Sequence, residues 1–279
     1  EFEQGIIDQI DDEGNYSQHS ANYHRMMLHL ALLYDALLRK NGRKMPQSVS
    51  TKLALATRWL VSQLEPINGH VPNLGHNDGT LLLPFGCAEY RDYRPVAQAA
   101  AIAFLGKPYL PHGEWDELAA WLGLEYDKQE MINIASITSP AIHQIGTVQS
   151  RGSMRGVRFH NRPAHADQLH VEIWWRGFNM ARDAGTYFYN APPPWQNGLD
   201  STRVHNTVTI DSQDQMQRIS RFLWLDQATA TWLKTDELDT IMAMHNGYRR
   251  SGIIHQRALT STSQGFRITD AFTPKTNDG

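Results

Sequence analysis

The stretch that decides the class of fold is Gln168-Leu169-His170-Val171-Glu172-Ile173-Trp174-Trp175. Apolar side chains stand at every second position of it: Leu169, Val171, Ile173 and Trp175. A period of two is typical of a β-strand that buries one face. Further strand-like runs follow at residues 206–210, 228–233, 252–259 and 265–272. Because no helical segment separates these runs, we expect an antiparallel sheet, most simply a β-sandwich.

The residues before this stretch have the period of helices. Apolar side chains recur every three or four residues in four segments: 23–42, 46–66, 95–106 and 115–122. Helices first and strands afterwards predict an α+β chain of two domains, residues 1–140 and residues 141–279. A long loop rich in Gly, Asn, Asp and aromatic residues separates the second helix from the third, and loops of this length are commonly functional.

Composition bounds the possible partners and the class of protein. The 279 residues include 26 Lys and Arg against 29 Asp and Glu, which gives a formal net charge of −3. No strong positive field attracts nucleic acid, so we expect none as a partner. The longest apolar run, residues 97–105, is about half of the ~18 residues that a membrane span needs. A single cysteine, Cys87, excludes an internal disulfide.

Both ends of the sequence look cut. The chain begins without Met, at Glu1, and stops at Gly279. We interpret it as a piece of a longer protein, so the lack of a targeting segment carries no information about its compartment.

Three side chains near the ends of consecutive predicted strands have the chemistry of a metal site. His165 precedes the strand at 168–175, Asp183 follows it, and His205 opens the next one. Two imidazoles and one carboxylate, together with a water, would complete a tetrahedral zinc site. The spacing equally allows each histidine to cap or pack locally.

Two polar clusters lie in the helical half. Asn22-Tyr23-His24-Arg25 brings acid-base and anion-binding groups to the start of the first predicted helix, where Asn22 could simply be a cap. The loop at 72–79 contributes His76-Asn77-Asp78-Gly79, and Tyr90 and Tyr93 follow it; Asn-Asp-Gly is also an ordinary turn. The sequence has no G-x-S-x-G, P-loop, dinucleotide-binding or H-E-x-x-H motif, so the corresponding enzyme classes lack support.

Five motifs, taken in order, resemble the heparinase II/III family of polysaccharide lyases, whose superfamily includes the alginate lyases. They lie at residues 22–25, 71–79, 165–167, 182–187 and 205–208. The resemblance implies an (α/α) toroid followed by an antiparallel β-sandwich. Residues 1–140 would then be the last part of the toroid, and residues 141–279 the first part of the sandwich. It also implies a structural zinc held by His165, Asp183 and His205, and a bacterial protein that is periplasmic or secreted.

The reaction that the resemblance implies is β-elimination across a uronic acid of an anionic polysaccharide. The C5 proton is weakly acidic, so hydrogen bonds must first neutralise the adjacent carboxylate. A base then takes the proton and an acid protonates the leaving O4. The resemblance gives the neutralising role to Asn22. We expect His76 to transfer the proton, with Tyr90 in reserve and His24 as the alternative.

The resemblance also places the substrate in a groove between the two domains. Asn22 and His24 are expected to face this groove, which also receives His76 and residues near His165. Further contacts with the polysaccharide are expected from Tyr23, Arg25, Asn77, Tyr93, His170 and Tyr189. The indoles of Trp174 and Trp195 are further candidates for stacking on sugar rings.

Two positions depart from the family's pattern. Pro163 stands where related lyases place a catalytic His, two residues before the metal-binding His. Leu74-Gly75-His76 stands where the family's catalytic Tyr is expected. Two other hypotheses therefore remain beside the lyase: a catalytically weak carbohydrate-binding relative, and a hydrolase that uses zinc-bound water.

Overall fold

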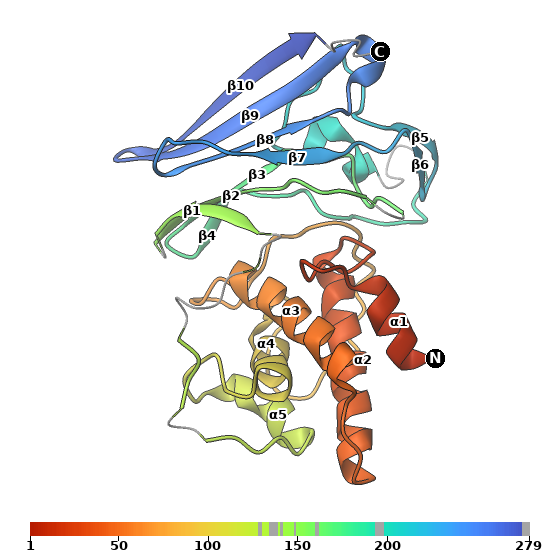
Figure 1. Ribbon diagram of the computed structural model, residues 1–279, viewed down its shortest axis with the longest axis vertical. Helices are drawn as coiled ribbons and strands as arrows, with labels where there is room; N and C mark the ends of the chain where they lie inside the picture. The colour runs from red at the N-terminus through yellow and green to blue at the C-terminus, as the bar shows by residue number, and fades with distance from the viewer. Residues whose placement is uncertain are drawn as a thin grey trace. The chain divides into compact units, whose positions relative to one another are not determined.

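The computed structural model describes residues 1–127, 130–133, 139, 142–147, 149–159, 162–192 and 198–274 (Figure 1). The chain divides into two compact units, residues 1–71 with 79–142 and residues 72–78 with 143–279. The expected boundary at residues 140 and 141 lies outside the described residues. The sequence gives no sign that the short segment Pro72–Asp78 lies with the second unit. No helix in the described part of the chain is long and apolar enough to cross a membrane.

The first unit is helical. Its elements are α1 (Phe2–Gln9), α2 (Ala21–Lys40), α3 (Gln47–Gln63), α4 (Arg94–Ala100) with a π-helical turn at Ala101–Leu105, a 3-10 turn at Glu114–Asp116, and α5 (Glu117–Trp121). The four predicted helices are confirmed. Helix α1 was not predicted, because eight residues contain too few turns to show a period. The described helices do not close a ring, so a complete toroid is not present in them.

Helix α2 shows why the helical prediction succeeds. Its N-cap is Ser20, whose Oγ accepts a hydrogen bond from the Tyr23 N–H at 3.1 Å. Gly42 ends it with a left-handed φ of 64°. Between these ends, its apolar face packs on α3, where Leu28 and Leu60 are fully buried. Local end signals and the burial pattern therefore agree.

The second unit is an antiparallel β-sandwich, as predicted. One sheet contains β1 (His143–Gly146), β2 (Ser150–Met154), β3 (Val171–Trp175) and β4 (Phe178–Ala181) in that order. The other contains β7 (Ala230–Leu233), β8 (Thr240–His245), β9 (Ile253–Thr262) and β10 (Gly265–Pro274). A separate hairpin is formed by β5 (Gln217–Ser220) and β6 (Leu223–Leu225).

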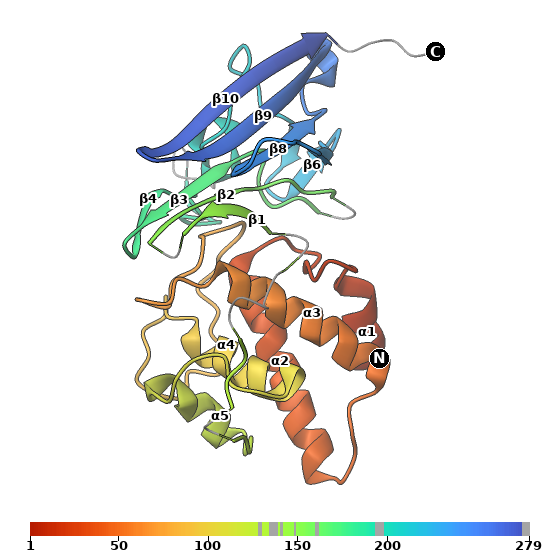
Figure 2. The same cartoon turned by 60° about the vertical axis from the view of Figure 1, so that its left-hand side comes forward.

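The two larger sheets face each other across a common apolar core (Figure 2). Met154 and Val171 come from the first sheet, and Ala243 and Leu259 come from the second. All of the strand pairs are antiparallel. This core holds the first sheet, from whose connections the candidate metal ligands project.

The prediction of a strand at residues 206–210 is wrong. The Asn206 amide donates to the Val171 carbonyl at 3.1 Å, and the Thr207 hydroxyl donates to the Gln168 carbonyl at 2.7 Å. These side chains satisfy backbone groups that a neighbouring strand would otherwise bond, so the segment bends instead of joining a ladder.

Burial along β3 departs from the predicted alternation at the end of the strand. Trp174 is 4% exposed, whereas Trp175 is 48% exposed, the reverse of the predicted faces. The strand keeps a regular register with β2, and the extra residue of the register shift against β4 lies on β4. Trp174 is therefore buried and does not offer its ring to a sugar, while Trp195 lies outside the described residues.

Two residues paired across β9 and β10 should differ greatly in how much stability is lost when each is truncated to alanine. Leu259 is fully buried, and Ile268, directly opposite it, is 42% exposed. Leu259→Ala should lower the free energy of unfolding by about 2–5 kcal/mol, because it leaves a cavity. Ile268→Ala should cost much less, as measured by urea denaturation. Equal costs would show that the two sheets do not pack as described.

Candidate active site and metal centre

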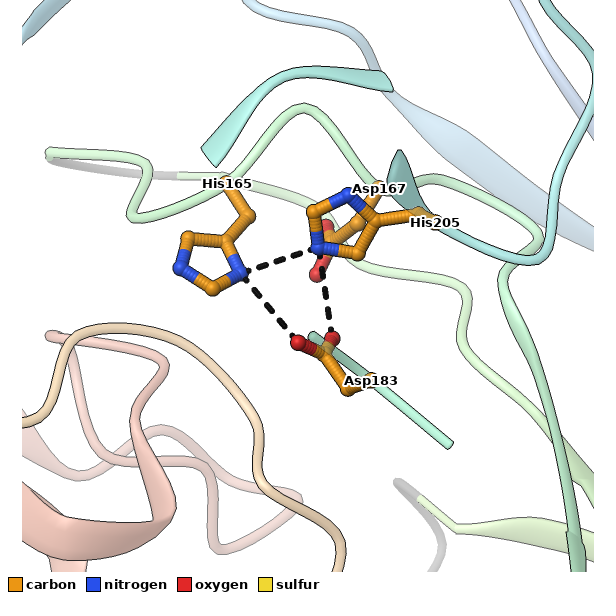
Figure 3. A group of neighbouring side chains, drawn as sticks. All are labelled: His165, Asp167, Asp183 and His205. Atoms are coloured by element: carbon orange, nitrogen blue, oxygen red, sulfur yellow. Dashed lines mark hydrogen bonds and ion pairs between the residues drawn. The ribbon is translucent and has the colours of Figure 1, made fainter. Parts of the chain in front are cut away.

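His165, Asp183 and His205 point at one another in the second unit (Figure 3). His205 Nε2 lies 3.1 Å from His165 Nδ1 and 3.4 Å from Asp183 Oδ2. His165 Nδ1 lies 3.7 Å from Asp183 Oδ1. Ligand atoms of a tetrahedral zinc with bonds of ~2.0–2.1 Å stand ~3.3 Å apart. The three buried side chains therefore fit an ion of this size.

The surrounding hydrogen bonds prepare two of these side chains for a metal. His205 Nδ1 lies 2.9 Å from the Ser201 carbonyl, so Nδ1 carries a proton and Nε2 is the ring nitrogen directed at the cluster. The Asp183 N–H donates to Glu172 Oε1 at 2.7 Å, and the Gly185 N–H donates to Asp183 Oδ1 at 2.7 Å. Partners of this kind are typical of metal sites, where they orient the ligands.

Electrostatics also couples the cluster. Burial opposes ionisation of Asp183, but hydrogen bonds and charge from His165 and His205 hold the pKa of its carboxyl well below the usual range. Burial lowers the pKa of His205, but the hydrogen bond and charge of Asp183 outweigh it and raise that pKa to about 9. The cluster therefore holds compensating charges in a buried place, which a bound cation would also supply.

A fourth side chain, Asp167, belongs to the same cluster. Ligand atoms of His165, Asp167, Asp183 and His205 all lie within 4.8 Å of one another. Asp167 is fully buried, and its Oδ2 lies 2.9 Å from Arg155 Nε. Sequence reasoning did not include Asp167 in this cluster, although its place two residues after His165 was a usable signal.

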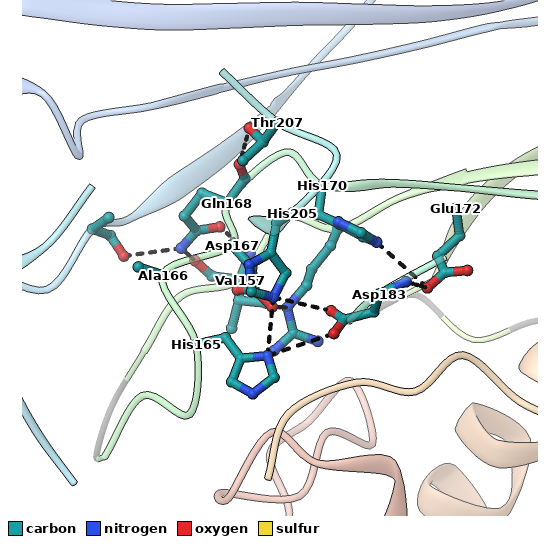
Figure 4. Close-up of polar contacts among 12 residues, drawn as sticks. Val157, His165, Ala166, Asp167, Gln168, His170, Glu172, Asp183, His205 and Thr207 are labelled. Carbon is teal, nitrogen blue, oxygen red and sulfur yellow. Dashed lines mark hydrogen bonds and ion pairs between the residues drawn. The ribbon is translucent and has the colours of Figure 1, made fainter. Parts of the chain in front are cut away.

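His170 does not lie where a substrate would reach it. The side chain is fully buried, its Nδ1 accepts from the Asn206 N–H at 2.9 Å, and its Nε2 lies 3.4 Å from Glu172 Oε1 (Figure 4). His170 therefore supports the backbone of the metal cluster instead of making the expected contact with substrate. His170 joins the segment of His205 to Glu172, which in turn holds the backbone of Asp183.

His76 reaches the same unit from the segment Pro72–Asp78. Its ring, 3% exposed, meets the edges of His165, Tyr189 and Phe222 with centroids 5.5–5.8 Å apart. Burial, followed by the charges of His165, Arg162 and Arg218, lowers the pKa of His76 to about 3. His76 is thus a neutral imidazole at neutral pH.

The next residue of the segment, Asn77, donates its N–H to Thr186 Oγ1 at 3.1 Å. Thr186 Oγ1 in turn donates to the Gly75 carbonyl at 3.2 Å. These bonds fix the backbone on both sides of His76. Asn77 makes its bond to Thr186 through its backbone N–H.

In the first unit, Asn22, Arg25 and Tyr90 form a second polar cluster. Asn22 Oδ1 accepts from Arg25 Nη2 at 2.6 Å and from the Tyr90 hydroxyl at 3.0 Å. The guanidinium of Arg25 lies 4.4 Å from the ring centroids of both Tyr90 and Tyr93. No carboxylate pairs with this buried cation among the described residues. Burial raises the pKa of Tyr93 to about 12, which keeps its hydroxyl protonated.

His24 packs between α2 and α3. Because α2 begins at Ala21, Asn22 and His24 are both helical, and their side chains point ~200° apart. His24 Nε2 lies 2.8 Å from the Ala56 carbonyl, and its ring stacks on Trp59 at 4.2 Å. Tyr23 uses its N–H for the Ser20 cap. His24 is therefore part of the packing between α2 and α3 and does not face a substrate.

Part of the chain matches a known protein family. Residues 149–279 match the family model described as heparinase II/III-like, C-terminal. Similar solved structures include heparinase III, with 16% identity and a TM-score of 0.66 over 99% of this chain and 42% of that chain. Heparan sulfate lyase HepC from Pedobacter heparinus has 17% identity and a TM-score of 0.59 over 98% of this chain and 40% of its own.

The chain therefore spans about two fifths of the length of these structures. At these identities the structural likeness shows the fold. No curated protein sequence matches the chain.

The buried position of His24 makes a prediction about pH. Burial lowers the pKa of His24 from 6.5 to about 4, although the Ala56 carbonyl raises it. The folded state therefore disfavours protonation of His24. The contribution of neutral His24 to the free energy of unfolding is complete above pH 6.5 and is lost as the pH falls from 6.5 to 4. The shift corresponds to about 3 kcal/mol. In His24→Gln, which keeps a donor for Ala56, the free energy of unfolding should fall less steeply over this range. An unchanged slope would contradict the assignment.

Proposed function

Because residues 149–279 match the family model described as heparinase II/III-like, C-terminal, we propose that this chain is part of a polysaccharide lyase. The substrate is an anionic, uronate-containing polysaccharide, and the reaction is β-elimination. In this proposal residues 1–140 are the last part of an (α/α) toroid, and the longer protein is periplasmic or secreted. The likeness to heparinase III over almost the whole chain supports it.

The observation that carries the proposal is the orientation of the Asn22 amide. Two donors, Arg25 and the Tyr90 hydroxyl, bind its oxygen, so the N–H2 end of the buried amide is turned away from both of them. A neutral donor can hydrogen-bond a uronate carboxylate and bind it more strongly as charge develops there during loss of the C5 proton. A rigid donor does this without reorganisation, and Arg25 and Tyr90 supply the rigidity.

This geometry gives different roles to Tyr90 and His24, the two other candidates for proton transfer. The Tyr90 hydroxyl donates its proton to Asn22, so Tyr90 is a positioning residue in the proposed mechanism. His24 is held by Ala56 and Trp59 and takes no part. Proton transfer falls to His76.

His76 is neutral and therefore able to accept the C5 proton. Its low pKa is due to burial and to the charges of His165, Arg162 and Arg218. A polyanionic substrate would oppose these positive charges and raise the pKa of His76 towards the working pH, where a general base is most effective. The same arginines would attract the polymer.

In this proposal the metal is a structural zinc held by His165, Asp183 and His205. Two imidazoles and a carboxylate are a ligand set that zinc prefers, whereas calcium and magnesium prefer oxygen alone. When bound, the ion would cross-link three segments: the loop before β3, the segment directly after β4, and the end of the 3-10 turn at Thr202–Val204.

One observation favours a second candidate. Pro163 has no acid-base group and stands where related lyases place a catalytic His. A protein that binds uronate polymers and no longer cleaves them would keep Asn22, Arg25 and the fold without that histidine.

Asn22→Asp tests the proposed function in the full-length protein. The new carboxylate accepts the same two hydrogen bonds and pairs with Arg25, so the fold should survive. Loss of the amide donor should lower the rate of elimination by ~10²–10³-fold. The rate is measured on a panel of uronate polymers from the ultraviolet absorbance of the 4,5-unsaturated product.

Asn68→Asp is the matched control, because its oxygen accepts from the His70 N–H in a turn outside the proposed site. It should leave the rate unchanged. A wild-type rate in Asn22→Asp would remove Asn22 from the mechanism. Wild-type protein that binds the polymers without any absorbance change would favour the carbohydrate-binding relative.

His76→Ala and His76→Gln test the proposed base. Both should lower turnover by ~10²–10⁴-fold, the usual contribution of a general acid or base. Glutamine fills most of the space of the imidazole, so a loss in both variants cannot be assigned to a cavity among His165, Tyr189 and Phe222. His70→Ala, in the same loop region, should keep its activity. Activity close to wild type in His76→Gln would exclude His76 as the base.

A further inference from the structure

Asp167 is a buried carboxylate whose environment is incomplete. The side chain is fully buried, and neither carboxylate oxygen has a hydrogen bond of good geometry within the described part of the chain. Arg155 Nε lies 2.9 Å from Oδ2. A second buried carboxylate, Asp183, belongs to the same cluster. Two carboxylates so close in the interior are costly unless a cation lies between them.

The geometry points to Asp167 as the fourth protein ligand of the zinc, closing its coordination sphere. This inference rests on the proposed zinc site of His165, Asp183 and His205. Figure 3 shows the Asp167 carboxylate directed to the same space as the ligand atoms of the other three. The farthest pair of these atoms is within 4.8 Å. A tetrahedron requires ~3.3 Å, so the carboxylate has to move by ~1.5 Å at most.

Charge balance supports this assignment. The divalent ion would neutralise Asp167 and Asp183 together, while Arg155 holds Asp167 next to the site. The backbone also holds Asp167 there, because its carbonyl accepts from the His170 N–H at 3.1 Å in a tight turn. His165 and Asp167 thus reach the ion from one short loop.

The consequence concerns reactivity. Structural zinc sites have four protein ligands, whereas catalytic ones keep a position open for water. With Asp167 bound, no position remains for a water or a substrate oxygen. The hydrolase hypothesis then loses its metal-bound water.

Cobalt(II) in place of zinc gives a direct test with Asp167→Cys. If residue 167 is a ligand, the variant should bind one cobalt and gain the near-ultraviolet charge-transfer absorption of a thiolate-cobalt bond. The wild type is the baseline, because its one thiol, Cys87, is exposed and does not belong to the cluster. A variant that binds one cobalt without this absorption would overturn the inference.

Azide provides an independent test that needs no folded cysteine variant. In cobalt-loaded wild type, azide should leave the visible spectrum unchanged, because no position is open. In Asp167→Ala, azide should alter the spectrum, and zinc affinity measured by chelator competition should fall by more than ~100-fold, beyond the loss expected for a residue that only orients a ligand. A spectral response in the wild type would show an open position and overturn the closure.

Asp200→Asn is the matched control. Asp200 is equally buried and lies 3.1 Å from Arg218, but it is not among the four ligand residues. Its zinc affinity should stay within a few-fold of wild type. Failure of the wild type to bind either metal would refute the zinc site itself, together with this inference. Stoichiometric binding with an azide response would refute only the role of Asp167.

Discussion

The guanidinium of Arg257 is the constraint on which the candidate metal centre depends. Arg257 lies on β9, in the sheet opposite β3, and its Nη1 donates to the carbonyls of Leu169 and Asn206 at 2.9 and 2.7 Å. Asp270 holds the other side of the guanidinium through Nε and Nη2. Burial opposes ionisation of the Asp270 carboxyl, but hydrogen bonds from His255 and Arg257 lower its pKa to about 2. One buried ion pair thus fixes the two segments that carry Asp167 and His205.

Leu169 shows the cost of this arrangement. It has a left-handed φ of 58°, which is unfavourable for a residue with a branched side chain, and it is fully buried. The hydrogen bond from Arg257 and the packing of the leucine in the core together maintain that conformation. The strained turn directs His165 and Asp167 to one side of the chain, where the ligands converge.

Much of this architecture could be predicted from the sequence because the signals are local. The strands around Val171, Ala230 and Leu259 alternate, and α2 carries its own cap residues. The metal candidates were found because residues at the ends of consecutive strands come together. Residues whose role depends on distant partners could not be assigned. The direction of His24 depends on where α2 begins, and that of His170 depends on a backbone N–H 36 residues away.

The segment Pro72–Asp78 has a consequence for biosynthesis. One partner in the second unit, Thr186, follows Asn77 by 109 residues, although the helices on either side of the segment precede it. At about 5–20 residues per second, the ribosome needs roughly 5–20 s to add that length of chain. During this interval the loop that carries His76 has no docking surface, while the neighbouring helices can already pack. Nascent-chain folding of this protein is therefore expected to finish at the loop, with its proposed base the last part to be ordered.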